Sequence, residues 1–128
     1  MATQVTHDIR ISVRVQYSEE QSDPKLGRYL YSYGIRIENR SNRTVQLMRR
    51  YWHITDSLAD QREVAGPGVV GETPVLAPGE QFTYTSYCDL KSGAGRMQGF
   101  YLMRHTDDGS TFEVPIPAFE LLYPFAAN

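Results

Sequence analysis

Cysteine is nearly absent from this sequence: Cys88 is the only one among 128 residues. A lone cysteine excludes an intramolecular disulfide and is typical of a reducing compartment. Long hydrophobic runs are also missing, because no segment approaches the roughly 18 apolar residues that a membrane helix needs. No apolar stretch follows Met1 as it would in a signal peptide. We therefore expect a cytoplasmic protein that has no membrane partner.

The sequence also lacks any block of like charge. Thirteen basic and fifteen acidic residues are scattered along the chain and leave a formal net charge of -2. Neither a basic arm for nucleic acid nor a basic membrane patch stands out, so we expect no nucleic-acid partner. Arg10, Arg14 and the pair Arg49–Arg50 are interleaved with acidic residues. This favours a solvated, salt-bridged sheet face.

Apolar and polar residues alternate in several short segments, which is the pattern of half-buried strands. Residues 5–17 predict one such strand, with His7 on its apolar side. Residues 29–38 predict a second strand, and a third that starts at Thr44 is expected to form a hairpin with it. The apolar parity of the third strand changes between Leu47 and Trp52, which predicts a β-bulge near residues 48–50.

Further strands are expected at 61–65, 82–88, 97–105 and 112–116, the last extending toward Tyr123. Asp107-Asp108-Gly109 predicts a hairpin turn, and Pro115 and Pro117 predict a strand at a sheet edge. No long segment has a helical period. About seven short antiparallel strands predict an all-β sandwich of the immunoglobulin-like class. The paired cysteines of antibody domains are absent, so we expect the fibronectin type III arrangement. We expect one domain, residues 1–128, with its core over about 5–125.

One glycine-rich segment carries a family resemblance. Residues 66–80 read as a glycine loop, G-P-G-V-V-G, followed by P-V-L-A-P-G-E and an aromatic strand at 82–86. This signature resembles that of the ApaG (CorD) family. Three flanking segments match as well, namely 51–55, 97–101 and 116–119. The matches occur in order and cover about residues 5–125.

The resemblance implies a fibronectin type III-like fold and no particular reaction. It also implies an association with cobalt and magnesium resistance or efflux, and with the gene neighbourhood of a diadenosine-tetraphosphate hydrolase. Related domains in eukaryotic F-box proteins and in a polymerase-interacting protein look like protein-interaction modules. We therefore expect a non-enzymatic binding domain without a cofactor, monomeric or homodimeric, that has a protein partner.

Two interpretations of the glycine loop stay open. Gly66, Gly68 and Gly71 satisfy G-x-G-x-x-G, which in dinucleotide folds cradles a pyrophosphate in front of a helix N-terminus. Pro74 follows too closely for such a helix, and Pro67 lacks an N–H donor. In the first interpretation these prolines argue against a phosphate site, and the glycines only allow the backbone a positive φ or a close approach. In the alternative, these three glycines bind a dinucleoside polyphosphate or pyrophosphate through backbone amides.

We expect no metal site, because the histidines His7, His53 and His105 lie far apart and Cys88 has no partner at ligand spacing. The adjacent carboxylates of residues 107 and 108 could coordinate magnesium in one interpretation. The favoured interpretation is that they belong to an ordinary hairpin turn.

No catalytic residue is predicted either. Ser86 and Cys88 share the apolar parity of their strand, and no nucleophile elbow surrounds them. Glu72 and Glu80 flank the glycine loop as an acid/base pair in one interpretation, and as solvated loop carboxylates in the favoured one.

Outward aromatic and arginine side chains support the interaction hypothesis, because both residue types are enriched at interface hot spots. Parity predicts that Arg36, Arg50 and Tyr87 point outward. These three are the candidates for partner contacts.

Overall fold

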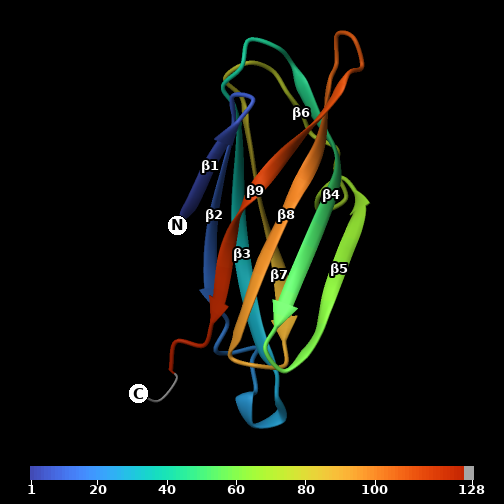
Figure 1. The fold of residues 1–128 in the computed structure, drawn as a ribbon. Coiled ribbons are helices and arrows are strands. Elements are labelled where there is room, and N and C mark those ends of the chain that lie inside the picture. Colours follow the sequence, from blue (N-terminus) through green and yellow to red (C-terminus); the bar gives the residue numbers. More distant parts are fainter. Residues whose placement is uncertain (126–128) are drawn as a thin grey trace.

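The computed structural model describes residues 1–125, which form two stacked antiparallel sheets (Figure 1). The strands are β1 (Ala2–Thr6), β2 (Ile9–Tyr17), β3 (Tyr29–Asn39), β4 (Val45–Asp56), β5 (Ala59–Pro67), β6 (Val75–Leu76), β7 (Gln81–Leu90), β8 (Ala94–His105) and β9 (Thr111–Leu122). A single 3₁₀ turn, η1 (Pro24–Leu26), lies between β2 and β3.

The first sheet has the strand order β1-β2-β3-β7, and the second has the order β5-β4-β8-β9 with the short β6 beside β4. Because β5 joins the second sheet, the arrangement is that of fibronectin type III domains. The all-β sandwich is therefore as predicted, but nine strands replace the expected seven. The proline-containing β9 lies at a sheet edge, as Pro115 and Pro117 predicted.

The prediction of a single strand over residues 5–17 is wrong, because these residues belong to a hairpin of two strands, β1 and β2. His7 and Asp8 have positive φ values of 51° and 60°, and Thr6 pairs with Ile9. A two-residue turn reverses the chain and inverts the parity, so Val5 is 51% exposed while Ile9 is fully buried. His7 is accordingly exposed in the turn and does not lie on an apolar face.

The predicted hairpin of the second and third strands is also wrong. β3 pairs with β2 and β7, whereas β4 belongs to the other sheet, so residues 40–44 cross between the sheets. The Asn39 side chain holds this crossing. Its Nδ2 donates to the carbonyl oxygens of Arg43 and Leu76 at 2.8 and 2.9 Å. Its Oδ1 accepts from the Ser41 N–H at 3.0 Å, so the buried amide is satisfied on both sides.

The predicted bulge in β4 is confirmed. The register with β8 shifts between Leu47 and Arg49, which leaves Met48 as the extra residue. As a result Trp52 and Arg50 turn to the inner side of the sheet, while Arg49 and Tyr51 turn outward.

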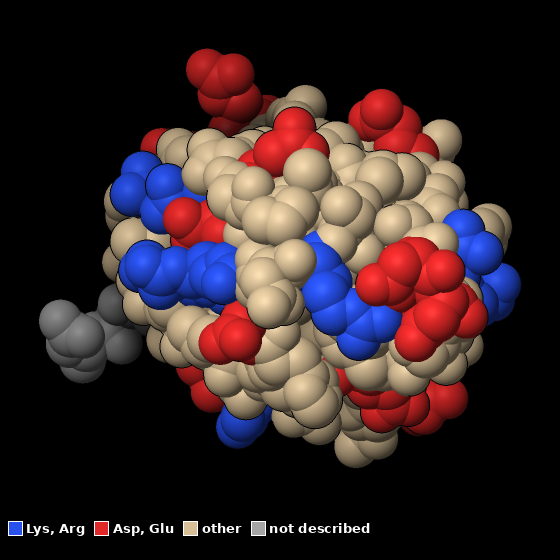
Figure 2. Space-filling view, turned by 90° about the horizontal axis from the view of Figure 1, so that it is seen from above, with Lys and Arg blue, Asp and Glu red and all other residues tan. Residues whose placement is uncertain are grey.

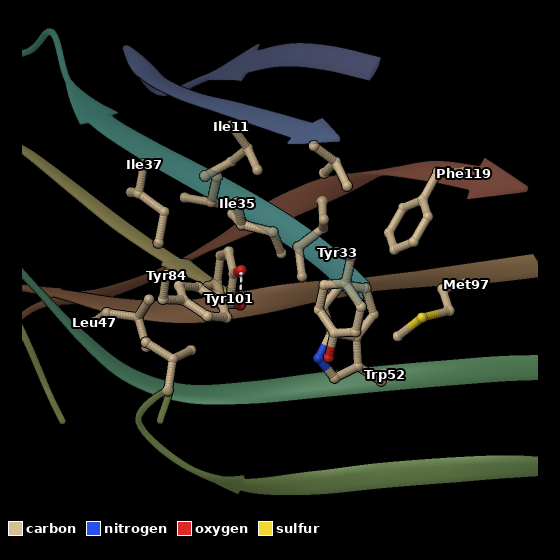
Figure 3. Packing of buried hydrophobic residues seen from close by; sticks show 14 of the residues in the cluster. Ile11, Tyr33, Ile35, Ile37, Leu47, Trp52, Tyr84, Met97, Tyr101 and Phe119 are labelled. Atoms are coloured by element: carbon tan, nitrogen blue, oxygen red, sulfur yellow. Dashed lines mark hydrogen bonds between the residues drawn. The ribbon is translucent and has the colours of Figure 1, made fainter. Parts of the chain in front are cut away.

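The core lies between the sheets and is rich in isoleucine and aromatic residues (Figure 3). Trp52 is 4% exposed, and its ring meets those of Tyr33 and Phe119 edge-on at 5.5 and 5.9 Å between centroids. The hydroxyl oxygens of Tyr84 and Tyr101 lie 2.5 Å apart and form one hydrogen bond. Burial raises the pKa of both hydroxyls above the ordinary value, so both stay protonated.

Candidate functional site

The glycine loop is a tight turn that uses most of its own backbone groups. Gly68, Val70 and Gly71 have positive φ values of 61°, 44° and 79°. The N–H and C=O groups of Val69 and Glu72 bond each other at 2.8 and 2.9 Å. The Gly68 N–H donates to the carbonyl oxygen of Met48 at 2.9 Å, so the loop is tied to the bulge of β4.

Each motif glycine has a distinct local role. A Cβ on Gly68 would come to 2.1 Å from the Glu72 carbonyl oxygen, whereas a Cβ on Gly71 would meet nothing within 4 Å. Gly66 has no positive φ, but its Cβ would lie 3.2 Å from Nη1 of Arg50. The fold thus gives all three glycines a structural role. The binding of an anion by Gly66, Gly68 and Gly71 stays a prediction.

Arg50 is the cation that the structure places at this loop. Its Nη1 donates to the carbonyl oxygens of Pro67 and Gly68, each at 3.0 Å. Within residues 1–125, no carboxylate oxygen lies within 4.0 Å of its guanidinium. The expectation that Arg50 points outward is therefore wrong. The bulge at Met48 turns it to the inner side, and its parity with Trp52 is the sequence signal of that position.

A hollow of about 170 Å³ lies between Arg50 and β7. We call it the Arg50 hollow; its lining includes Tyr33, Tyr84, Ser86 and the loop residues 69–71. Burial raises the pKa of the Tyr33 hydroxyl, while a hydrogen bond with Ser86 and the charge of Arg50 act in the opposite direction. A positive charge that backbone groups hold in place thus faces the hydroxyl-bearing residues Tyr33, Tyr84 and Ser86, of which the two tyrosines are buried.

β7 forms one side of the hollow and has a free edge. It pairs with β3 only, so in the part of the chain that the structure describes its other edge has no strand partner. Residues 81–88 contain no charged residue, proline or glycine. The other edge strands carry the features that discourage pairing: β1 has only five residues, β5 contains Asp60, Arg62, Glu63 and Pro67, and β9 contains Pro115 and Pro117. The free edge of β7 is thus the unprotected one.

β5 is the edge strand of the second sheet and lies at one outer side of the sandwich, beyond the strands of the first sheet (Figure 1). Val64 pairs with Trp52 and shares its inward direction, yet Val64 is 39% exposed. Arg62 spans the two sheets, because its Nη2 donates to the carbonyl oxygen of Asp89 at 2.6 Å. The inner side of β5 near Val64 is therefore open beside the edge of β7.

The three histidines are not gathered at this site. His53 Nδ1 lies 3.6 Å from Glu63 Oε1 on the outer face of the second sheet. His7 and His105 both contact the ring of Phe112, at centroid distances of 5.5 and 4.5 Å. Among the described residues, no three His, Cys, Asp or Glu side chains form a group that could hold a metal ion.

The carboxylates of the β8–β9 turn are engaged by protein groups. Arg43 Nη2 lies 2.7 Å from Asp107 and 3.2 Å from Asp108, and Asp108 accepts the Ser110 N–H at 2.9 Å. Seen from above, basic and acidic side chains are interspersed on this end of the sandwich (Figure 2). Asp107-Asp108-Gly109 forms the β8–β9 turn, as predicted.

The side chains considered for catalysis have different surroundings. Glu80 Oε1 accepts the Ala77 N–H at 2.7 Å, and Glu72 is exposed at the loop. Cys88 is buried, and burial raises the pKa of its thiol to about 11. Ser86 is half-buried in the wall of the Arg50 hollow.

A second surface, on the outer face of the second sheet, was not found by the sequence patterns. The rings of Tyr51 and Phe100 stack at 4.5 Å, and Arg49 lies over Tyr51 at 5.9 Å. Tyr51 and Phe100 border a hollow of about 640 Å³. Of the side chains expected to point outward, Tyr87 is 60% exposed and Arg36 lies 4.0 Å from Glu38 on the first sheet.

Among the described residues, no helix is both long enough and apolar enough to cross a membrane.

Comparison with known proteins agrees with the resemblance in the sequence. The family model described as the ApaG domain matches residues 19–105. "Protein ApaG" of Allorhizobium ampelinum is 52% identical over 120 residues, which cover 94% of this chain and 92% of the relative. "Protein ApaG" of Paramagnetospirillum magneticum is 47% identical over 124 residues, covering 97% and 95%. The crystal structure of the putative ApaA protein from Bordetella pertussis superposes with a TM-score of 0.88 at 44% identity, covering 93% and 96%. This chain therefore belongs to the ApaG domain family.

Proposed function

We propose that this chain is a non-enzymatic interaction module that binds a partner protein by adding a strand of the partner to the free edge of β7. The observation that carries the proposal is the uncharged edge of residues 81–88, whose sheet has no further strand on that side. A free edge presents a row of unpaired N–H and C=O groups, and an extended segment of another chain can pair with them.

The alternation of β7 adds specificity to such pairing. Thr83, Thr85 and Tyr87 are exposed on the outer face, while Tyr84 and Cys88 are buried. Main-chain hydrogen bonds would supply affinity, and the exposed side chains would select the side chains of the incoming strand. On this proposal the family's association with cobalt and magnesium resistance acts through the partner protein.

A photo-crosslinking experiment tests this function. A benzoylphenylalanine placed at Tyr87, in cells that express the protein natively, should give one discrete adduct with another protein. The matched control is the same group at Gln98, an exposed residue of β8, which has strand partners on both sides. Equal adducts at both positions, or none at Tyr87, would contradict the proposal. An adduct of twice the chain mass would identify a homodimer in place of a foreign partner.

A second candidate function is the binding of a dinucleoside polyphosphate or pyrophosphate at Gly66, Gly68 and Gly71. The observation that favours it is the guanidinium of Arg50, held beside the loop without a carboxylate partner among the described residues. An amide NMR titration with diadenosine tetraphosphate, with and without magnesium, tests it. Shifts confined to residues 66–72 would support this candidate, and unchanged amides at millimolar ligand would refute it.

A further inference from the structure

We propose that the partner segment which pairs with β7 ends at the Arg50 hollow, where Arg50 binds the C-terminal carboxylate of that segment. This inference rests on the strand addition proposed above and specifies the partner as a protein with an accessible, extended C-terminus.

The charge of the hollow selects an anion. Arg50 is anchored by the carbonyl oxygens of Pro67 and Gly68 through Nη1. Neither Nη2 nor Nε donates a hydrogen bond within residues 1–125, so these donors remain for a ligand. A guanidinium held in place by backbone groups loses little freedom on binding and matches the planar geometry of a carboxylate.

The size of the hollow selects a chain end. Its volume of about 170 Å³ is well below the roughly 300–1,000 Å³ of pockets that enclose whole small-molecule ligands. A terminal carboxylate with one side chain needs far less space than a dinucleoside polyphosphate. The aromatic rings of Tyr33, Trp52 and Tyr84 in the lining suit an apolar last side chain.

The position of the hollow ties it to the edge of β7. Tyr84 and Ser86 belong to both, so a segment paired with β7 passes the mouth of the hollow. The glycine loop at residues 69–71 lines the other side of the hollow. We infer that an added strand ends against this loop. The N–H groups of Val70 and Gly71 have no acceptor within the described residues, and both residues line the hollow. A chain that stops here would leave its carboxylate among these donors and Arg50.

Displayed random heptapeptides with free C-termini provide the probe, because the natural partner is unidentified. A peptide enriched on the wild-type protein is synthesised as the acid and as the C-terminal amide. We expect the acid to bind at least about tenfold more tightly than the amide, because hydrogen bonds to charged groups are the strong ones. Changes in amide chemical shift on adding the acid peptide should be confined to β7 and residues 66–72.

Variants of Arg50 test whether this side chain binds the carboxylate. Arg50→Gln should remove most of the difference between acid and amide, and Arg50→Lys, which keeps the charge, should restore part of it. The backbone NMR spectrum of each variant verifies that the sandwich is folded.

The outcomes separate the two proposals. Equal binding of acid and amide, with shifts on β7, would overturn the carboxylate site and leave strand addition standing. Acid-selective binding that needs Arg50 but leaves β7 unshifted would overturn strand addition, on which this inference rests. Failure to enrich any peptide would overturn the inference.

Discussion

Gly66 lies beside the guanidinium of Arg50, close enough that a Cβ on Gly66 would come to 3.2 Å from Nη1. The two residues pair across β4 and β5 and face the same side of the sheet. The missing side chain of Gly66 is therefore what gives the Arg50 guanidinium its place against the carbonyl oxygens of Pro67 and Gly68.

Gly66→Val should displace that guanidinium and break its two bonds to the loop. Valine is a good strand former, so the backbone itself tolerates it. We expect a loss of about 1–3 kcal/mol in the free energy of unfolding, measured with urea, because the bonds involve a charged donor. In an Arg50→Gln background the same substitution should cost much less. Equal costs in both backgrounds would show that Gly66 does not act through Arg50.

Gly68→Ala and Gly71→Ala form a matched pair that separates packing from backbone conformation. Both glycines have positive φ, which costs an alanine roughly 1–2 kcal/mol. Only at Gly68 would the new Cβ also strike a backbone oxygen, that of Glu72, at 2.1 Å. Gly68→Ala should therefore destabilise the protein clearly more than Gly71→Ala in urea unfolding. Similar losses at both positions would contradict this account of the motif.

The buried pair of Tyr84 and Tyr101 lends itself to a double-mutant cycle. Either Phe substitution alone leaves the other hydroxyl without its partner at 2.5 Å, which should cost about 1–3 kcal/mol. The double substitution removes both polar groups and should cost less than the sum of the single losses. Thermal and urea unfolding measure the three variants. Strict additivity would mean that the two hydroxyls do not interact.

Asp56 at the end of β4 should make stability depend on pH. Burial opposes ionisation of its carboxyl, but hydrogen bonds from the Lys91 N–H at 2.6 Å, from the Ser92 hydroxyl at 2.7 Å and from the Leu58 N–H at 3.2 Å outweigh it. The pKa of Asp56 is therefore lowered on folding. A lowered pKa means that the stabilisation is complete above the unfolded-state pKa, near 3.9, and is lost as the pH falls through the folded-state value.

The substitution Asp56→Asn tests the direction of this pH dependence of stability. At pH 7 the variant should be about 1–3 kcal/mol less stable than the wild type in urea, because an amide nitrogen would face backbone donors. The difference should shrink as the pH is lowered below 4. Asp60→Asn, at an exposed position of β5, is the control and should show little effect. A difference for Asp56→Asn that is constant between pH 7 and pH 3 would contradict the assignment.

The sequence patterns predicted the parts of this fold that follow from local alternation. The bulge near Met48 and the edge position of β9 could be read directly, because parity and proline report on a single strand. The turn at His7 and Asp8 could not, because neither residue is the glycine or asparagine that usually marks a two-residue hairpin. The crossing after β3 also escaped prediction, since strand partners are chosen by packing between distant segments.

The candidate site was predictable only in part. The glycine loop was found through the spacing of its glycines, and the strand that follows it through its alternation. That the loop folds back onto Arg50, and that one edge of β7 lacks a strand partner among the described residues, depends on which sheet β5 joins. Local sequence carries no signal for that choice, so the hollow between them appears only in three dimensions.

Met48, the extra residue in β4, sets the phase of every side chain that follows it in the strand. If β4 ran through Met48 in regular alternation, without the bulge, Arg50 would turn toward solvent and Tyr51 would come to the inner side. The cation of the hollow is thus specified by the spacing of the chain as much as by the arginine itself. An alignment that matches this segment without a gap to a sequence lacking the bulge would equate side chains that face opposite sides of the sheet.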